Sequence, residues 1–96
     1  MRRADPHGQL REALLAAGPI SIAASTQKSW ASATFSGTRH RFECWLEPTG
    51  RQWLDGIEER DIPLVGHFLA DIAICDESRS DDRISLVIEA LTVVEA

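Results

Sequence analysis

The sequence lacks the features that most directly identify a class of protein. It has no run of about 18 or more apolar residues, so no segment has the composition of a transmembrane helix. It has no phosphate-binding loop of the GxGxxG or GxxxxGK[ST] kind and no G-x-S-x-G turn. These absences argue against the common nucleotide-binding folds and against the α/β-hydrolases.

Basic residues are scarce. The chain has 10 Lys and Arg against 15 Asp and Glu, which gives a net charge of −5. Because nonspecific binding to phosphates depends on basic side chains, nucleic acids and anionic membranes are not expected partners. Phosphate contact through Arg39, Arg41 and Arg51 therefore ranks last among the functional hypotheses.

Cysteine is scarce as well, with only Cys44 and Cys75. The alternation of the strands that carry them puts the two thiols on opposite faces, so we expect no disulfide. Two unpaired cysteines fit a reducing compartment, and we predict a cytoplasmic protein. Arg2 and Arg3 precede an apolar run at residues 13–17, as in a signal peptide, but acidic residues near the start and the Gly18-Pro19 break argue against one.

Dense groups of metal ligands are missing too. There is no CxxC pair, the spacing of His40 and Cys44 matches no zinc motif, and no D-x-[DN]-x-[DN]-G calcium loop occurs. We expect neither a metal nor another cofactor.

What is present indicates one folded domain over residues 1–96, with residues 1–4 as a flexible tail. Apolar residues make up 44% of the chain and charged residues 26%, as is usual for globular proteins. Asp5-Pro6 and Gly18-Pro19 bracket an apolar stripe at helical spacing, which predicts a helix over residues 6–17.

The strongest local pattern lies between Trp30 and Glu47. With Gly37-Thr38 as a type II′ turn, it reads as a β-hairpin in which Phe35 faces His40 on an apolar side. The same register sets Trp30 opposite Trp45 on the other side.

The remaining segments complete an α-β-β-β-α-β-β order. We expect a strand at 20–25, a turn at 26–28 and a short helix at about 50–59, for which an irregular segment is the alternative. Alternation at 67–76 and 83–90 predicts a second hairpin around a charged loop at 77–82. The predicted fold is α+β, with two layers: an antiparallel sheet of about five strands carrying one or two helices on one face.

The leading functional hypothesis is a non-enzymatic domain that acts through protein contacts and associates with itself. Its basis is the outward side of the predicted sheet, which is more apolar than usual for an antiparallel sheet. The expected interface patch consists of Trp30, Trp45, Leu69, Val87 and Leu91. The alternative left open is that the second helix or the C-terminal residues cover this patch.

A second hypothesis is a ligand or enzymatic site between sheet and helix. Arg39, His40, Arg41 and His67 are candidate anion or ligand contacts, and Cys44 lies near His40 on the same face. A thiol on an apolar face has a raised pKa and is a poor nucleophile, and no residue is placed by sequence to orient His40. No catalytic residue is therefore assigned.

Overall fold

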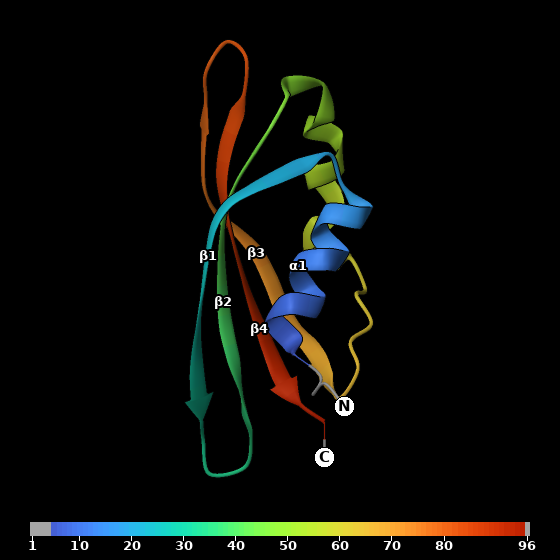
Figure 1. The fold of residues 1–96 in the computed structure, drawn as a ribbon, viewed down its shortest axis with the longest axis vertical. Coiled ribbons are helices and arrows are strands. Elements are labelled where there is room, and N and C mark those ends of the chain that lie inside the picture. Colours follow the sequence, from blue (N-terminus) through green and yellow to red (C-terminus); the bar gives the residue numbers. More distant parts are fainter. Residues whose placement is uncertain (1–4, 96) are drawn as a thin grey trace.

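An antiparallel sheet of four strands carries two helices on one of its faces (Figure 1). The structure is a computed structural model that describes residues 5–95, so the tail expected at residues 1–4 lies outside the described residues. The elements are, in chain order, α1 (Pro6–Ala17), β1 (Ile20–Ala31), β2 (Ser36–Leu46), the 3-10 helix η1 (Pro48–Glu59), β3 (His67–Arg79) and β4 (Ile84–Val94). The strands lie side by side as β1-β2-β4-β3. The α+β class is confirmed.

Helix α1 has the predicted bounds because its end signals are strong. The Asp5 side chain accepts a hydrogen bond from the His7 backbone N–H at 3.1 Å, and Pro6 occupies the first turn. At the other end, the Gly18 N–H donates to the Leu14 carbonyl. Leu10 and Leu14 are fully buried against the sheet.

The first hairpin differs from the prediction. Strand β1 runs from Ile20 to Ala31 without the turn expected at 26–28. The strand predicted at 20–25 and the one predicted to begin at Trp30 are therefore a single strand, and the sheet has four strands instead of about five. The chain turns at residues 32–35, where the Ser32 N–H donates to the Phe35 carbonyl at 2.7 Å. Trp30 pairs with Gly37 and Trp45 pairs with Ser21, so the predicted Gly37-Thr38 turn and the Trp30–Trp45 pair are both wrong.

Gly37 has a packing role in place of the predicted turn role. A Cβ atom there would overlap the backbone carbonyl oxygen of Thr92 and would lie 3.0 Å from the indole Nε1 of Trp30. The missing side chain lets the Trp30 ring lie over the strand. The glycine that was interpreted as a turn residue is therefore explained by the close approach of three strands at this position.

The second hairpin is longer than predicted, and one of its strands changes phase. Strand β4 buries Ile84, Leu86, Ile88 and Ala90, as its alternation predicts. Strand β3 has register shifts at residues 70 and 75, each of which adds a residue without a partner. Leu69, predicted to belong to the outward interface patch, therefore pairs with Thr92 and packs against the core, whereas Phe68 points outward.

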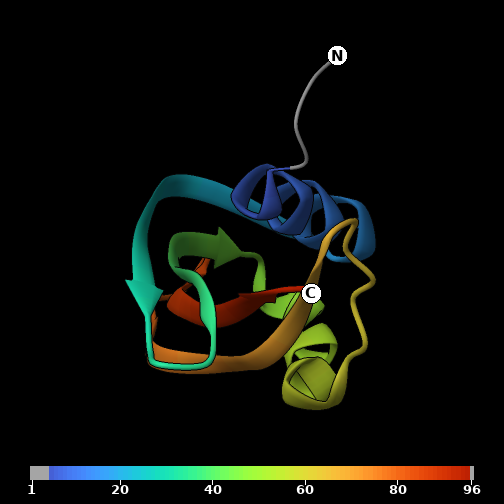
Figure 2. The same cartoon turned by 90° about the horizontal axis from the view of Figure 1, so that it is seen from below.

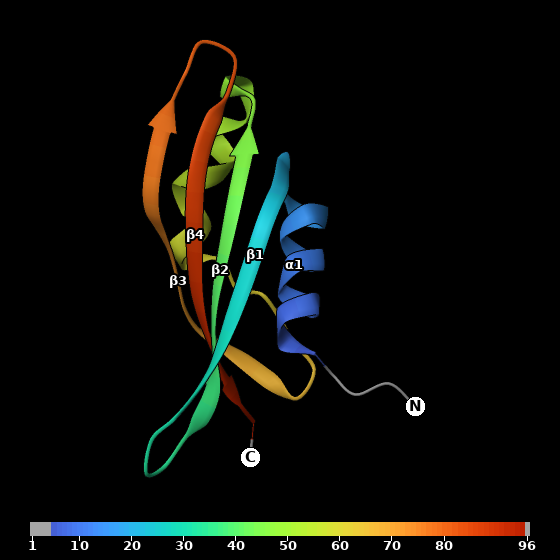
Figure 3. The same cartoon turned by 60° about the vertical axis from the view of Figure 1, so that its left-hand side comes forward.

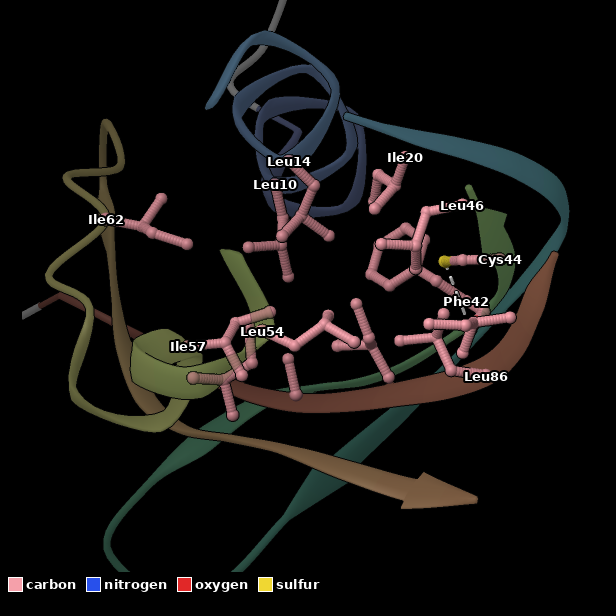
Figure 4. Close-up of a cluster of buried hydrophobic side chains, with 14 residues drawn as sticks. Leu10, Leu14, Ile20, Phe42, Cys44, Leu46, Leu54, Ile57, Ile62 and Leu86 are labelled. Atoms are coloured by element: carbon pink, nitrogen blue, oxygen red, sulfur yellow. Dashed lines mark hydrogen bonds between the residues drawn. The ribbon is translucent and has the colours of Figure 1, made fainter. Parts of the chain in front are cut away.

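The core lies between the sheet and the two helices (Figure 4). Helix η1 contributes Leu54 and Ile57, in the short helical segment that the sequence predicts, and the connector after it contributes Ile62. From the sheet, Phe42, Leu46 and Ile88 reach the same core. Viewed along the long axis, α1 lies beside β1 and η1 lies beside β3, with the core between the two helices (Figure 2). None of the helices formed by residues 5–95 is long and apolar enough to cross a membrane.

The packing at Gly37 generates a test of the fold. We expect Gly37→Ala to lower the free energy of unfolding by about 1–3 kcal/mol, because the added methyl group collides with backbone that belongs to the centre of the sheet. Gly56→Ala is the matched control, since a Cβ atom there meets nothing within 4 Å. It should change stability by less than about 1 kcal/mol. Urea unfolding measures both, and equal effects would contradict the close approach at Gly37.

Candidate functional site

The sheet face opposite the two helices has no helix of the described residues over it (Figure 3). We call it the outer face, and the helix-covered side the inner face. Directly paired residues of antiparallel strands share a face, so the registers define the outer face as rows across β1, β2, β4 and β3. The five rows are Trp30–Gly37–Val93–Phe68, Lys28–Arg39–Leu91–Asp71, Thr26–Arg41–Glu89–Ala73, Ala24–Glu43–Val87–Asp76 and Ser21–Trp45–Ser85–Ser78.

A hollow of about 530 Å³ occupies the middle of the outer face. All four strands line it, mainly through the second and third rows. Leu91 of β4 lines it, and so does Cys75, which lies where β3 bulges. The hollow is open to solvent, so its walls are available to another molecule.

Charges on the outer face are divided between its two halves. Lys28, Arg39 and Arg41 lie on β1 and β2, whereas Asp71, Asp76 and Glu89 lie on β3 and β4. The exceptions are Glu43 on β2 and Arg83, which directly precedes β4. Arg41 donates to Glu89 at 2.9 Å, in an ion pair of which both side chains are about half exposed. Such an exposed pair contributes little to stability.

Lys28 and Arg39 stand directly opposite each other on neighbouring strands. Like charges in this arrangement repel, and among residues 5–95 neither has an acidic side chain within ion-pair distance. Their charges are therefore available to an acidic group from outside.

Apolar side chains lie at both ends of the outer face. In the first row, Trp30 lies over Gly37 and Val93 is buried, while Phe68 is 47% exposed. In the fifth row, the Arg83 guanidinium lies 4.2 Å from the centre of the Trp45 ring.

Four of the five residues of the predicted interface patch are on the outer face. Trp30, Trp45, Val87 and Leu91 lie there, with the two tryptophans in the first and last rows. Leu69 is on the inner face, because the bulge at residue 70 reverses the phase of β3 before it.

A second polar cluster lies on the inner face. His7 of α1 lies 2.8 Å from His40 of β2, Nδ1 to Nδ1, and its Nε2 lies 3.0 Å from the Ser25 hydroxyl of β1. The Nε2 atom of His40 lies 2.8 Å from the Thr92 hydroxyl of β4. We call Ser25, His7, His40 and Thr92 the histidine chain. It links α1 to three strands.

One set of tautomers satisfies every contact in the histidine chain with both imidazoles neutral. Ser25 donates its hydroxyl hydrogen to His7 Nε2, and the His7 Nδ1–H donates to His40 Nδ1. The His40 Nε2–H then donates to the Thr92 hydroxyl, which can donate to the Thr38 carbonyl at 3.4 Å. Two protonated imidazoles would direct N–H groups at each other, so the chain holds at most one extra proton.

Burial is the main reason that both histidines resist protonation. The pKa of His40 is lowered to about 4, mainly by burial and in part by the positive charges that His7 and His67 carry when protonated, while Asp5 opposes the decrease. Burial also lowers the pKa of His7, against the opposing effect of Asp5, and Arg11 adds to the decrease. At neutral pH both rings are uncharged hydrogen-bonding groups.

The residues proposed for a site between sheet and helix do not come together. His40, Cys44 and His67 are on the inner face, but Arg41 points to the outer face. Burial raises the pKa of Cys44 to about 11, and its thiol lies 3.5 Å from the Phe42 carbonyl. Both ring nitrogens of His40 are already engaged by His7 and Thr92, so His40 is not free to activate that thiol.

His67 begins β3 on the inner face, beside Val94. Its Nδ1 atom is buried without a hydrogen-bond partner among the described residues. Within residues 5–95, no group of three or more His, Cys, Asp or Glu side chains could hold a metal ion. Of the predicted anion contacts, Arg39 and Arg41 are on the outer face, and His40 and His67 are on the inner face.

Sequence reasoning missed His7, Ser25 and Thr92, because they belong to three elements that come together only in the folded chain. It missed Lys28 and Thr26 for another reason, since the segment that holds them was predicted to be a turn. The alternation of Thr26, Lys28 and Trp30 is the signal that places them on one face.

Comparison with known proteins gives no match to a family model, to a curated protein or to a solved structure. The class that the structure defines is an α+β domain with a four-stranded antiparallel sheet.

The histidine chain predicts a pH dependence of stability. Between about pH 6.5 and pH 4, an unfolded histidine binds a proton that folded His40 does not, so the free energy of unfolding should fall as the pH falls through this range. The loss attributable to His40 is on the order of 3 kcal/mol at most. His40→Gln should flatten this part of the profile, as measured by urea unfolding at a series of pH values. An unchanged slope would show that His40 does not carry the effect.

The two thiols should differ in reactivity. Cys44 is buried and Cys75 is exposed, and both are free. We expect native protein at about pH 8 to react with one equivalent of Ellman's reagent, and denatured protein with two. Cys75→Ser should remove the native reaction, whereas rapid labelling of Cys44 in the native state would contradict its burial.

Proposed function

We propose that this protein is a non-enzymatic domain that works through protein contacts made by the outer face, and that a second copy of the chain is its partner. The observation that carries the proposal is the divided charge of a sheet face that no helix within residues 5–95 covers. A face with cations on one half and acids on the other is able to complement itself.

The apolar residues of the outer face support a contact role. Phe68 is about half exposed, and Leu91 lies in the hollow within reach of a docking partner. Aromatic residues are enriched in protein interfaces, and here they lie at the two ends of the outer face, with the charged rows between them.

The area of the outer face sets the expected strength of association. Four strands and five rows span roughly 650 Å² per copy from standard strand spacings. Two such faces bury about 1,300 Å² in total, which is at the lower end of specific interfaces. We therefore expect a reversible dimer with a dissociation constant in the micromolar range or weaker.

A ligand or enzymatic site remains the second hypothesis, but less supports it. Its proposed residues divide between the two faces, and the thiol among them has a raised pKa. A cytoplasmic location belongs to the main proposal, since two free cysteines suit a reducing compartment.

Sedimentation velocity tests the proposal directly. We expect the mean mass to rise toward that of a dimer between about micromolar and millimolar protein concentration. Leu91→Arg should weaken association at least about tenfold, because it puts an unpaired charge at the centre of the interface. Leu15→Arg, on the exposed side of α1, is the matched control and should associate like the natural protein. Thermal unfolding of both variants shows whether weaker association comes from a lost contact or from a destabilised fold. If the natural protein stays monomeric over the whole concentration range, the proposal is refuted.

A further inference from the structure

We propose that two copies pack outer face to outer face about a two-fold axis that runs parallel to the strands, between β2 and β4. This arrangement rests on the proposed function, since it specifies how a second copy would occupy the outer face. It makes the interface isologous, so each contact occurs twice.

The symmetry operation follows from the strand order. A half-turn about an axis parallel to the strands keeps each row in place and exchanges the two ends of the row. Strand β1 of one copy then lies over β3 of the second copy, and β2 lies over β4. The strand axes of the two sheets are nearly parallel, as in aligned sheet packing, and each strand lies over one that runs in the opposite direction.

The rows of the outer face match under this operation. In the second row, Lys28 meets Asp71 of the second copy, and its positive charge gains the acidic partner that it lacks within the described residues. Arg41 in the third row meets Glu89 of the second copy. In the first row, Trp30 meets Phe68 of the second copy. This contact covers the exposed part of the Phe68 ring.

Two other features of the rows agree with this operation. Gly37 meets Val93 of the second copy, so a residue without a side chain faces an apolar one. Glu43, the one acid on the basic half, meets Val87 of the second copy and not another acid. No row therefore brings like charges together.

A two-fold axis perpendicular to the strands gives a poorer match. An axis of this kind that passes through the third row places each strand over the same strand of the second copy. It exchanges the first row with the fifth and the second row with the fourth. Arg41 would then meet Arg41 of the second copy, and Asp71 would meet Asp76 of the second copy. Such like-charge contacts oppose association.

Pairing between sheet edges is the remaining alternative. Strand β3 is poorly suited to it, because two bulges interrupt that edge. Strand β1 has one irregularity, near residue 23, and is otherwise a continuous edge. Pairing of the β1 edge would place Lys28 beside the added strand, whereas Asp71 on β3 would stay away from the contact. The variant at Asp71 therefore separates the two arrangements.

Charge exchange between Lys28 and Asp71 tests the proposed axis. We expect Lys28→Asp and Asp71→Lys each to weaken self-association about tenfold, since each variant faces two like-charge contacts in a dimer of its own kind. An equimolar mixture of the two variants should restore association to near the natural strength, because both contacts become attractive in the mixed dimer. Sedimentation velocity measures all three, and Leu15→Arg again serves as the control.

The outcomes distinguish the arrangement from the function on which it rests. Weakening by each variant together with recovery in the mixture supports the parallel axis. Stronger association of Asp71→Lys would overturn it in favour of the perpendicular axis, which places this residue against Asp76. No effect of Asp71→Lys, with slower amide exchange along β1 on association, would overturn it in favour of edge pairing. A natural protein that never associates removes the proposed function as well.

Discussion

The pairing of β2 with β4 is the constraint on which the rest of the structure depends. These central strands are in register from Gly37 opposite Val93 to Leu46 opposite Ile84, without interruption. The same register places Phe42 and Ile88 together in the core and Arg41 beside Glu89 on the outer face. Because side chains alternate along a strand, a shift of one residue would exchange the two faces and expose the core.

The inner face changes from apolar to polar along its length, and this change determines how α1 lies on it. Leu10 and Leu14 of the helix meet the apolar part, while His7 in the first turn meets His40. Buried polar groups need hydrogen-bond partners, so the histidine chain favours one position of the helix over others that the apolar contacts alone would tolerate. The outer face has no helix of residues 5–95 over it, and Lys28 and Arg39 on that face have no acidic side chain of the described residues within ion-pair distance.

Sequence patterns predicted the parts of the fold that depend on neighbouring residues. The bounds of α1 follow from Asp5-Pro6 and Gly18, and the inward positions of β2 and β4 follow from simple alternation. The first hairpin was wrong because Gly37 suits a tight turn as well as it suits the close approach of Trp30 and Thr92. In β3 the bulges reversed the phase at Leu69, and no local signal marks a bulge there.

The sequence by itself determined the α+β class, the helix over residues 6–17 and the face of the sheet that residues 40–45 of β2 and residues 84–90 of β4 take. Only the tertiary structure decided the number of strands, the pairing of Trp30 with Gly37, the meeting of His7 with His40 and the separation of charge on the outer face. The physical reason is that alternation and end signals act over a few residues. Register, bulges and buried hydrogen bonds depend on which distant segments become neighbours.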